Sequence, residues 1–321
     1  MRKVVNHLSF AFIVLIMILT SVHLVHGQPV SEMYDYSNFD SIEEAAEFLL
    51  ENVEHEEPPL ICVSFPSDSS DRRGEYDRLE ALAFSNETAD PFAGDFALKH
   101  VSGGSLGGGF ENGRCYLYIR YNYYITPEEL EKEKNLISEI NKSLEIPDDS
   151  ADYEIVAAIE NYIQDHVSYD NASIETEDKT HFTAYKAVTK GRATCLGYSE
   201  LFYAFCKLNG INARILTTPE HALNLCEIDG IYYFADCVWD QPIELLNGEK
   251  TVFPNESSGF LTGLNDQPYF KENKLPDRYT SAEFNDKYPI ADNRYEPKVP
   301  LWQLFFQNIV PGILGSFFRL D

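Results

Sequence analysis

Hydrophobic and polar positions along the first half of the chain switch between helical and strand-like spacing. Ser41 and Glu44 form a capping box ahead of an apolar stripe, so a helix is predicted to begin there. The segment 126–129 (Thr-Pro-Glu-Glu) supplies an N-cap, a first-turn proline and a second capping box, and predicts another helix. Between these helices, 60–65 and 116–125 are rich in aromatic and β-branched residues and are predicted to be strands.

A different pattern occupies residues 66–114, which are rich in Pro, Ser, Asp and Gly and include the glycine run 103–109. The run lacks the Lys-Ser or Lys-Thr pair of a phosphate-binding loop. We therefore expect the glycine run to be a turn or linker and not a nucleotide site.

From about residue 150 the pattern becomes one of helices followed by short strands. Helices are predicted to begin at the N-cap Asp152 and to cover 183–189 and 195–208, and strands are predicted over 213–217, 221–228 and 231–238. Asp229-Gly230 joins the last two strands as a two-residue hairpin turn. Helices leading into an antiparallel sheet predict an α+β domain.

Both ends of the chain are predicted to be separate segments. Arg2 and Lys3 precede an uncharged apolar stretch, and 25–27 (Val-His-Gly) ends in a small residue just before Gln28, which is typical of a cleaved secretory signal. An uncleaved anchor is the alternative, because the stretch is almost long enough to span a bilayer. Aromatic and aliphatic residues crowd 301–321, which is predicted to dock on a membrane or a protein partner, or to fold back onto the domain.

Composition narrows the classes of function. The 321 residues include 25 Lys and Arg against 52 Asp and Glu, a formal net charge of -27. Nucleic-acid binding depends on clustered basic residues, so no nucleic-acid partner is expected. Six cysteines are too sparse for a disulfide framework in a chain of this length, and no CxxC pair indicates a metal. No cofactor and no metal are predicted.

Three residues with complementary chemistry follow one another in the second half: Cys195, His221 and Asp236. Cys195 opens a predicted helix behind Thr194, a potential N-cap, where the positive end of the helix dipole favours a thiolate. Free backbone N–H groups at the same helix end could hold an oxyanion, and Gly197 leaves room for a close approach. Each residue alone is more often structural, but together they predict a catalytic arrangement.

The hairpin register provides a geometric test of this arrangement. With 229–230 as the turn, His221 faces Val238, and Asp236 is the diagonal neighbour of His221 on the same face. Such neighbours are within reach of an imidazole–carboxylate hydrogen bond. A carboxylate in that position fixes the tautomer of His221 and stabilises its charged form.

These segments resemble motifs of the transglutaminase-like superfamily, which has a papain-like fold. The segment 191–199 (Gly-Arg-Ala-Thr-Cys-Leu-Gly-Tyr-Ser) is similar to the nucleophile motif, and 221–224 with 229–240 is similar to the His and Asp motifs. Upstream, 166–170 (His-Val-Ser-Tyr-Asp) resembles the segment that closes the first helix of the family. The resemblance covers about 150–245.

The resemblance implies a bacterial-type secreted member in which Cys195 is the nucleophile, His221 the general base and acid, and Asp236 its orienting partner. Leu223 and Val238 depart from the family, which commonly has an aromatic residue and a threonine at these positions. Tyr185 is a weak candidate for a side-chain oxyanion donor.

The predicted fold is α+β: a papain-like core with the nucleophile at a helix N-terminus packed on an antiparallel sheet, plus a smaller N-terminal α/β region. The predicted segments are a signal peptide (1–27), an N-terminal accessory region (28–149), the core (150–245), a C-terminal extension (246–300) and a hydrophobic tail (301–321). We expect a secreted or surface-located thiol enzyme that forms an acyl-thioester on Cys195 from a protein or peptide amide. Hydrolysis and crosslinking both remain open, and a catalytically silent domain that binds a surface protein or glycan is the alternative.

Overall fold

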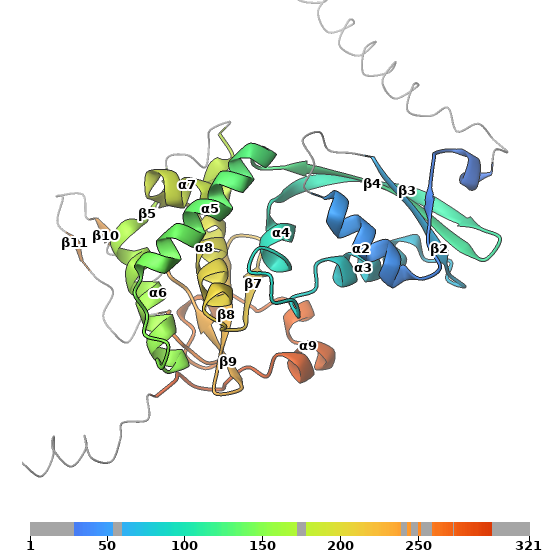
Figure 1. Cartoon of the computed structure of the whole chain (residues 1–321). Coiled ribbons are helices and arrows are strands. Elements are labelled where there is room, and N and C mark those ends of the chain that lie inside the picture. Colours follow the sequence, from blue (N-terminus) through green and yellow to red (C-terminus); the bar gives the residue numbers. More distant parts are fainter. Residues whose placement is uncertain are drawn as a thin grey trace, which may run out of the picture. The chain divides into compact units, whose positions relative to one another are not determined.

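The computed structural model describes residues 29–53, 60–171, 178–238, 243–244, 250–251, 259–271 and 273–296 (Figure 1). The predicted signal peptide and the tail 301–321 lie outside the described residues. Contacts divide the chain into a first unit, Met1–Ala83 with Gly104–Tyr121, and a second unit, Phe84–Gly103 with Asn122–Asp321. The second unit includes residues on both sides of the predicted boundary at residue 150, which stays a prediction. No helix in the described ranges is both long and apolar enough to cross a bilayer.

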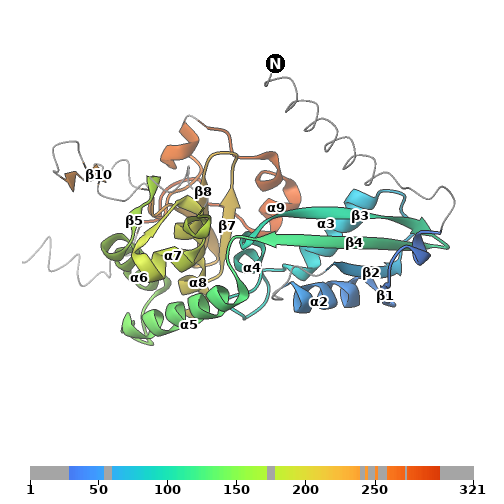
Figure 2. The ribbon, with the colours of Figure 1, turned by 90° about the horizontal axis from the view of Figure 1, so that it is seen from above.

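The first unit contains a four-stranded sheet and two helices (Figures 1 and 2). Its elements are η1 (Val30–Glu32), β1 (Ser37–Asn38), α2 (Ile42–Asn52), β2 (Ile61–Pro66), α3 (Arg72–Ala83), β3 (Val101–Glu111) and β4 (Arg114–Tyr123), of which β3 and β4 each reach a few residues into the second unit. The strand order is β1-β2-β4-β3, with β1 parallel and β4 antiparallel to β2. The predicted cap of α2 is confirmed, because Ser41 Oγ accepts a hydrogen bond from the Glu44 N–H at 3.2 Å.

The glycine run corrects the sequence prediction, because it forms strand β3 and is neither a turn nor a linker. Its hydrogen-bonded neighbour in the sheet is β4, which follows after Asn112 and Gly113, both with positive φ. A Cβ atom on Gly104 would lie 2.2 Å from the carbonyl oxygen of Arg120, and one on Gly108 would lie 1.9 Å from that of Tyr116. The glycines therefore allow the backbones of the two strands to come unusually close.

The second unit contains most of the helices. They are α4 (Asp95–Lys99), α5 (Pro127–Ser143), α6 (Asp152–His166), η3 (Thr180–Phe182), α7 (Ala184–Lys190), α8 (Cys195–Leu208), η5 (Pro268–Lys271), η6 (Asp277–Tyr279) and α9 (Ala282–Lys287). The capping box predicted for α5 is present between Thr126 and Glu129. Helix α6 begins one residue earlier than predicted, because Ala151 and not Asp152 is its N-cap, with the carboxylate of Glu154 accepting the Ala151 N–H.

The remaining strands of this unit include a three-stranded antiparallel sheet. Its strands are β7 (Ala213–Thr217), β8 (Ala222–Ile228) and β9 (Ile231–Ala235), and two further strand pairs are β5 (Ser168–Tyr169) with β6 (Arg192–Ala193) and β10 (Ile243–Glu244) with β11 (Lys250–Thr251). The predicted hairpin turn is confirmed, with Asp229 and Gly230 at φ 54 and 83 and Ile228 paired with Ile231. Helix α8 packs against β7 and β8, so the α+β class with a helix on an antiparallel sheet is also confirmed.

Candidate active site

Helix α8 begins at Cys195, so the predicted nucleophile lies in its first turn. Ten consecutive residues of the helix, 197–206, are buried, which fixes the position of that turn relative to the core. Cys195 is partly exposed, whereas the other five cysteines are buried. Cys195 is therefore the one accessible thiol among the six cysteines, and it lies at the positive end of a helix dipole.

Thr194 occupies the N-cap position of α8, but its side chain does not cap the helix. Its Oγ1 donates a hydrogen bond to the carbonyl oxygen of His181 at 3.0 Å, and its backbone N–H donates to the same oxygen at 2.9 Å. The expected side-chain cap is wrong because the buried hydroxyl fastens the helix start to η3. The hydroxyl therefore accepts no hydrogen bond from the first-turn N–H groups of α8, and these groups can donate to other acceptors.

Gly197 brings α8 close to neighbouring segments of the chain. A Cβ atom at this position would lie 2.5 Å from the carbonyl oxygen of Thr183 and 2.8 Å from Cβ of Ala193. Only glycine fits without a shift of the Thr183 backbone, which precedes α7, or of strand β6. This contact helps to set the position of the first turn of α8.

His221 immediately precedes β8, and Asp236 immediately follows β9. Regular pairing of β8 with β9 ends at Asn224 and Ala235. Beyond this pair, His221 Nε2 and Asp236 Oδ2 form a hydrogen bond of 2.8 Å. The side chains are only 9% and 1% exposed. The structure therefore confirms the predicted imidazole–carboxylate contact.

The His221 imidazole also hydrogen-bonds to the side chain of Cys195. Burial alone lowers the pKa of His221, but the hydrogen bonds and charges of Asp236 and Cys195 outweigh burial and raise that pKa to about 10. Because Nε2 faces Asp236, Nδ1 is the ring nitrogen left for the Cys195 sulfur. The charged form of the imidazole is thus favoured by contacts with both Asp236 and Cys195.

Tyr169 is a site residue that the sequence analysis did not identify. It pairs with Ala193 in the parallel β5–β6 ladder, which brings its hydroxyl against the side chain and the backbone N–H of Cys195. Burial, followed by the charge and hydrogen bond of Cys195, raises the pKa of Tyr169 to about 12, so the phenol is protonated and can donate. The one feature of the sequence that pointed to Tyr169 was its place in segment 166–170, which resembles a segment of the family.

Tyr185, the earlier candidate for an oxyanion donor, serves a different contact. It lies on α7, and the ammonium group of Lys132 on α5 lies 5.7 Å from the centroid of its ring. This cation–π contact joins two helices. Tyr169, which interacts with Cys195, is the better supported candidate donor.

Residues of the predicted C-terminal extension also reach His221 and Asp236. The ring centroid of Tyr269 lies 4.8 Å from that of His221, and the Tyr269 hydroxyl lies 2.8 Å from Thr218 Oγ1. Thr218 Oγ1 in turn accepts the backbone N–H of His221 at 3.0 Å. A Cβ on Gly259 would lie 2.8 Å from Cβ of Asp236, so this glycine packs directly on the carboxylate residue.

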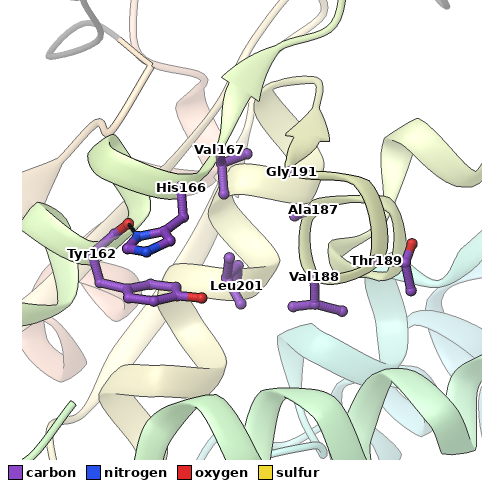
Figure 3. A pocket seen from close by; sticks show the side chains of 8 residues that line it. All are labelled: Tyr162, His166, Val167, Ala187, Val188, Thr189, Gly191 and Leu201. Atoms are coloured by element: carbon purple, nitrogen blue, oxygen red, sulfur yellow. Dashed lines mark hydrogen bonds between the residues drawn. The ribbon is translucent and has the colours of Figure 1, made fainter. Parts of the chain in front are cut away.

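A pocket of about 180 Å³ opens beside α6, α7 and α8 (Figure 3). It is lined by Tyr162, His166, Val167, Ala187, Val188, Thr189, Gly191 and Leu201. The His166 ring stacks on the Tyr162 ring at a centroid distance of 4.1 Å. None of the three predicted catalytic residues lines this pocket, so it is distinct from the arrangement around Cys195.

Comparison with known proteins agrees with this geometry. Residues 140–241 match the family model of the transglutaminase-like superfamily. The human protein Kyphoscoliosis peptidase is 26% identical over a match that covers 38% of this chain and 21% of the relative. The match thus spans about a fifth of the length of that relative.

Two solved structures have local similarity to the chain. One is a TGase at 15% identity and a TM-score of 0.31, covering 62% of this chain and 55% of the other. The second is a candidate cysteine protease from Cytophaga hutchinsonii at 16% identity and a TM-score of 0.27, covering 48% of this chain and 70% of the other. Both scores are low, and the similarity to the family rests on the matched segment.

The matched segment 140–241 contains Cys195, His221 and Asp236, together with Tyr169. It also contains the helix that begins at the cysteine and the hairpin that carries the other two residues. The similarity to the transglutaminase-like superfamily therefore covers the segment that holds the candidate catalytic residues.

Proposed function

We propose that the chain is an exported thiol enzyme that attacks protein or peptide amides and forms an acyl-thioester on Cys195. The observation that supports this proposal best is the hydrogen-bonded series from Cys195 through His221 to Asp236 at the start of α8. Nucleophilic thiol catalysis requires an accessible sulfur, a base in contact with it and a group that orients the base.

In the first half-reaction, the Cys195 sulfur attacks the amide carbonyl carbon and the carbonyl oxygen takes up the negative charge. Backbone N–H groups at the start of α8 and the Tyr169 hydroxyl are the proposed donors to this oxygen. As the C–N bond breaks, His221 gives its proton to the leaving amine. The products of this step are an acyl-thioester and a free amine.

In the second half-reaction, His221 removes a proton from the incoming nucleophile, which attacks the thioester carbonyl and releases the thiol. Water as the nucleophile gives peptidase or deamidase chemistry, and a primary amine gives a crosslink. We favour hydrolysis, because a partly exposed site meets far more water than amine and because the human relative is named a peptidase.

Export is a separate part of the proposal. It rests on the secretory-signal pattern of residues 1–27, and the hydrophobic tail 301–321 is the proposed point of attachment to a membrane or a protein partner.

The test is the pH dependence of Cys195 alkylation by iodoacetamide, followed by mass spectrometry in the purified protein and in His221→Gln. At about pH 6, well below the pKa of a free thiol, we expect modification of Cys195 to be at least about tenfold faster than that of free cysteine. The substitution of His221 should abolish this advantage. The five buried cysteines provide internal references in the same digest.

Slow alkylation of Cys195 that follows an ordinary thiol and ignores His221 would sink the enzyme proposal in favour of a silent binding domain. If the thiol is activated, a glutamine-containing peptide separates the two reactions. Ammonia release without added amine indicates deamidation, whereas mass gain that depends on an added primary amine indicates crosslinking.

A further inference from the structure

Three ionisable side chains from three different helices meet in the interior of the second unit, away from any role in the proposed reaction. They are His100, which follows α4, Glu133 on α5 and Glu200 on α8. Their exposed fractions are 2%, 0% and 0%. Burial of a histidine and two carboxylates carries a large desolvation penalty unless the charges are compensated.

The donor atoms are close enough to share one ion. His100 Nε2 lies 2.7 Å from Glu133 Oε2 and 3.8 Å from Glu200 Oε2, and one ligand atom from each residue lies within 4.8 Å of the others. Two ligands of a tetrahedral zinc ion lie about 3.4 Å apart, given bonds of about 2.1 Å. The two distances from His100 bracket that value, and they must change by about 0.7 Å and about 0.4 Å for an ion to bind.

The surroundings orient His100 as a ligand. Its Nδ1 lies 2.8 Å from the carbonyl oxygen of Phe96, an acceptor only, so Nδ1 carries a proton and donates. In the neutral ring the lone pair is then on Nε2, which faces the carboxylates. Glu200 Oε2 accepts the N–H of Ala184 at 2.9 Å, a contact of the kind that orients ligating carboxylates.

Two oxygen atoms of the cluster have no hydrogen-bond partner, namely Oε1 of Glu133 and Oε1 of Glu200, and both are fully enclosed. One proton shared among a neutral histidine and two carboxylates leaves one uncompensated negative charge in the interior. A divalent ion with one neutral histidine and two carboxylates gives a net charge of zero. It can also accept a third or fourth bond from these oxygens.

We propose that His100, Glu133 and Glu200 bind a divalent transition-metal ion of the zinc type. An imidazole ligand with few oxygen ligands favours zinc over magnesium or calcium, which prefer six or more oxygens. The ion joins α4 and α5 to α8, the helix that begins at Cys195, and so serves a structural role. The sequence predicted no metal because these ligands are far apart in the chain and match no spacing motif.

The experiment measures metal bound on folding, because the site is enclosed. The full chain is unfolded with a chelator and refolded with Zn²⁺, with Co²⁺ or with chelator only, then freed of loose metal and analysed by elemental mass spectrometry. We expect about one ion per chain, a visible absorption band for the Co²⁺ form, and a higher unfolding midpoint with metal than without.

Three variants locate the ion. In His100→Gln and in the isosteric Glu133→Gln, bound metal should fall at least about tenfold. In the control His166→Gln the amount of bound metal should not change. Like Nδ1 of His100, Nδ1 of His166 lies 2.8 Å from a carbonyl oxygen one turn earlier, but His166 is exposed. If His100→Gln does not refold, Glu133→Gln gives the answer.

Refolded chain without stoichiometric metal would overturn the proposal, as would equal metal content in the parent and the Glu133→Gln variant. Neither result bears on the proposed function, which the alkylation of Cys195 tests independently.

Discussion

Cys195 takes its chemical surroundings from residues that are distant in the sequence. His221 and Asp236 could be predicted, because a two-residue turn fixes the register of their hairpin and residue types alone suggest their pairing. Tyr169 could not, because its contact depends on a parallel ladder between two short strands that the local pattern does not reveal. Local signals specify neighbours across a hairpin, whereas parallel pairing is decided by the tertiary fold.

The phenol of Tyr169 provides a test of the proposed oxyanion site. Tyr169→Phe removes a donor beside Cys195 but keeps the ring, so acylation by a p-nitrophenyl ester should slow by about 10²-fold. Alkylation by iodoacetamide forms no oxyanion and should change little. Stopped-flow absorbance measures the first rate and mass spectrometry the second.

Tyr185→Phe is the matched control, since that tyrosine packs under Lys132. Equal effects of the two substitutions, or a loss of alkylation that parallels the loss of acylation, would contradict a specific role of the Tyr169 hydroxyl.

The raised pKa of His221 predicts a pH-dependent contribution to stability. Because the folded state holds the proton more tightly than the unfolded state, the contribution is complete below pH 6.5 and is lost as the pH rises through about 10. Relative to His221→Gln, the free energy of unfolding should fall by a few kcal/mol over this range. Urea denaturation at several pH values measures the difference, and a flat difference would mean that the buried ring is uncharged.

At the scale of elements, prediction succeeded where the determining signal is local. Helix α5 has a capping box and a first-turn proline, and α8 is followed by Asn209 and Gly210, so their bounds were readable from the sequence. Strand β3 was missed because a glycine run has no side-chain periodicity. Its conformation depends on close contact with the backbone of β4, which a single-strand pattern does not contain.

This account of β3 predicts opposite outcomes for two glycines of the strand. In Gly104→Ala the new methyl group would lie 2.2 Å from the Arg120 carbonyl oxygen, so the free energy of unfolding should fall by about 1–3 kcal/mol. In Gly109→Ala the nearest atom is a methyl group of Val30 at 3.7 Å, an ordinary contact, and the change should stay within about 0.5 kcal/mol. Urea unfolding monitored by circular dichroism compares them, and equal losses would argue against close pairing of β3 with β4.

At the scale of the whole molecule, the segment that resembles the family depends on residues that precede it. Asp95 on α4 accepts Arg214 Nε on β7 at 2.7 Å and the backbone N–H of Ile215 at the same distance. The side chains of this ion pair are 5% and 15% exposed. Tyr203 on α8 likewise donates to Oδ1 of Asn86 at 2.8 Å. Residues 84–103 thus contribute contacts to the sheet and to the helix that carry the candidate active site.

These contacts predict that a fragment covering 150–321 does not fold cooperatively, although it contains all three predicted catalytic residues. Removing Asp95 leaves Arg214 buried without its partner, a loss of about 3–5 kcal/mol. This loss is a large part of the 5–15 kcal/mol that typically stabilises a whole domain. Circular dichroism during urea titration, with the full chain as reference, makes the comparison. If the fragment instead unfolds in a sharp transition and its Cys195 reacts like that of the full chain, the boundary near 150 marks an autonomous domain and Asp95 is dispensable.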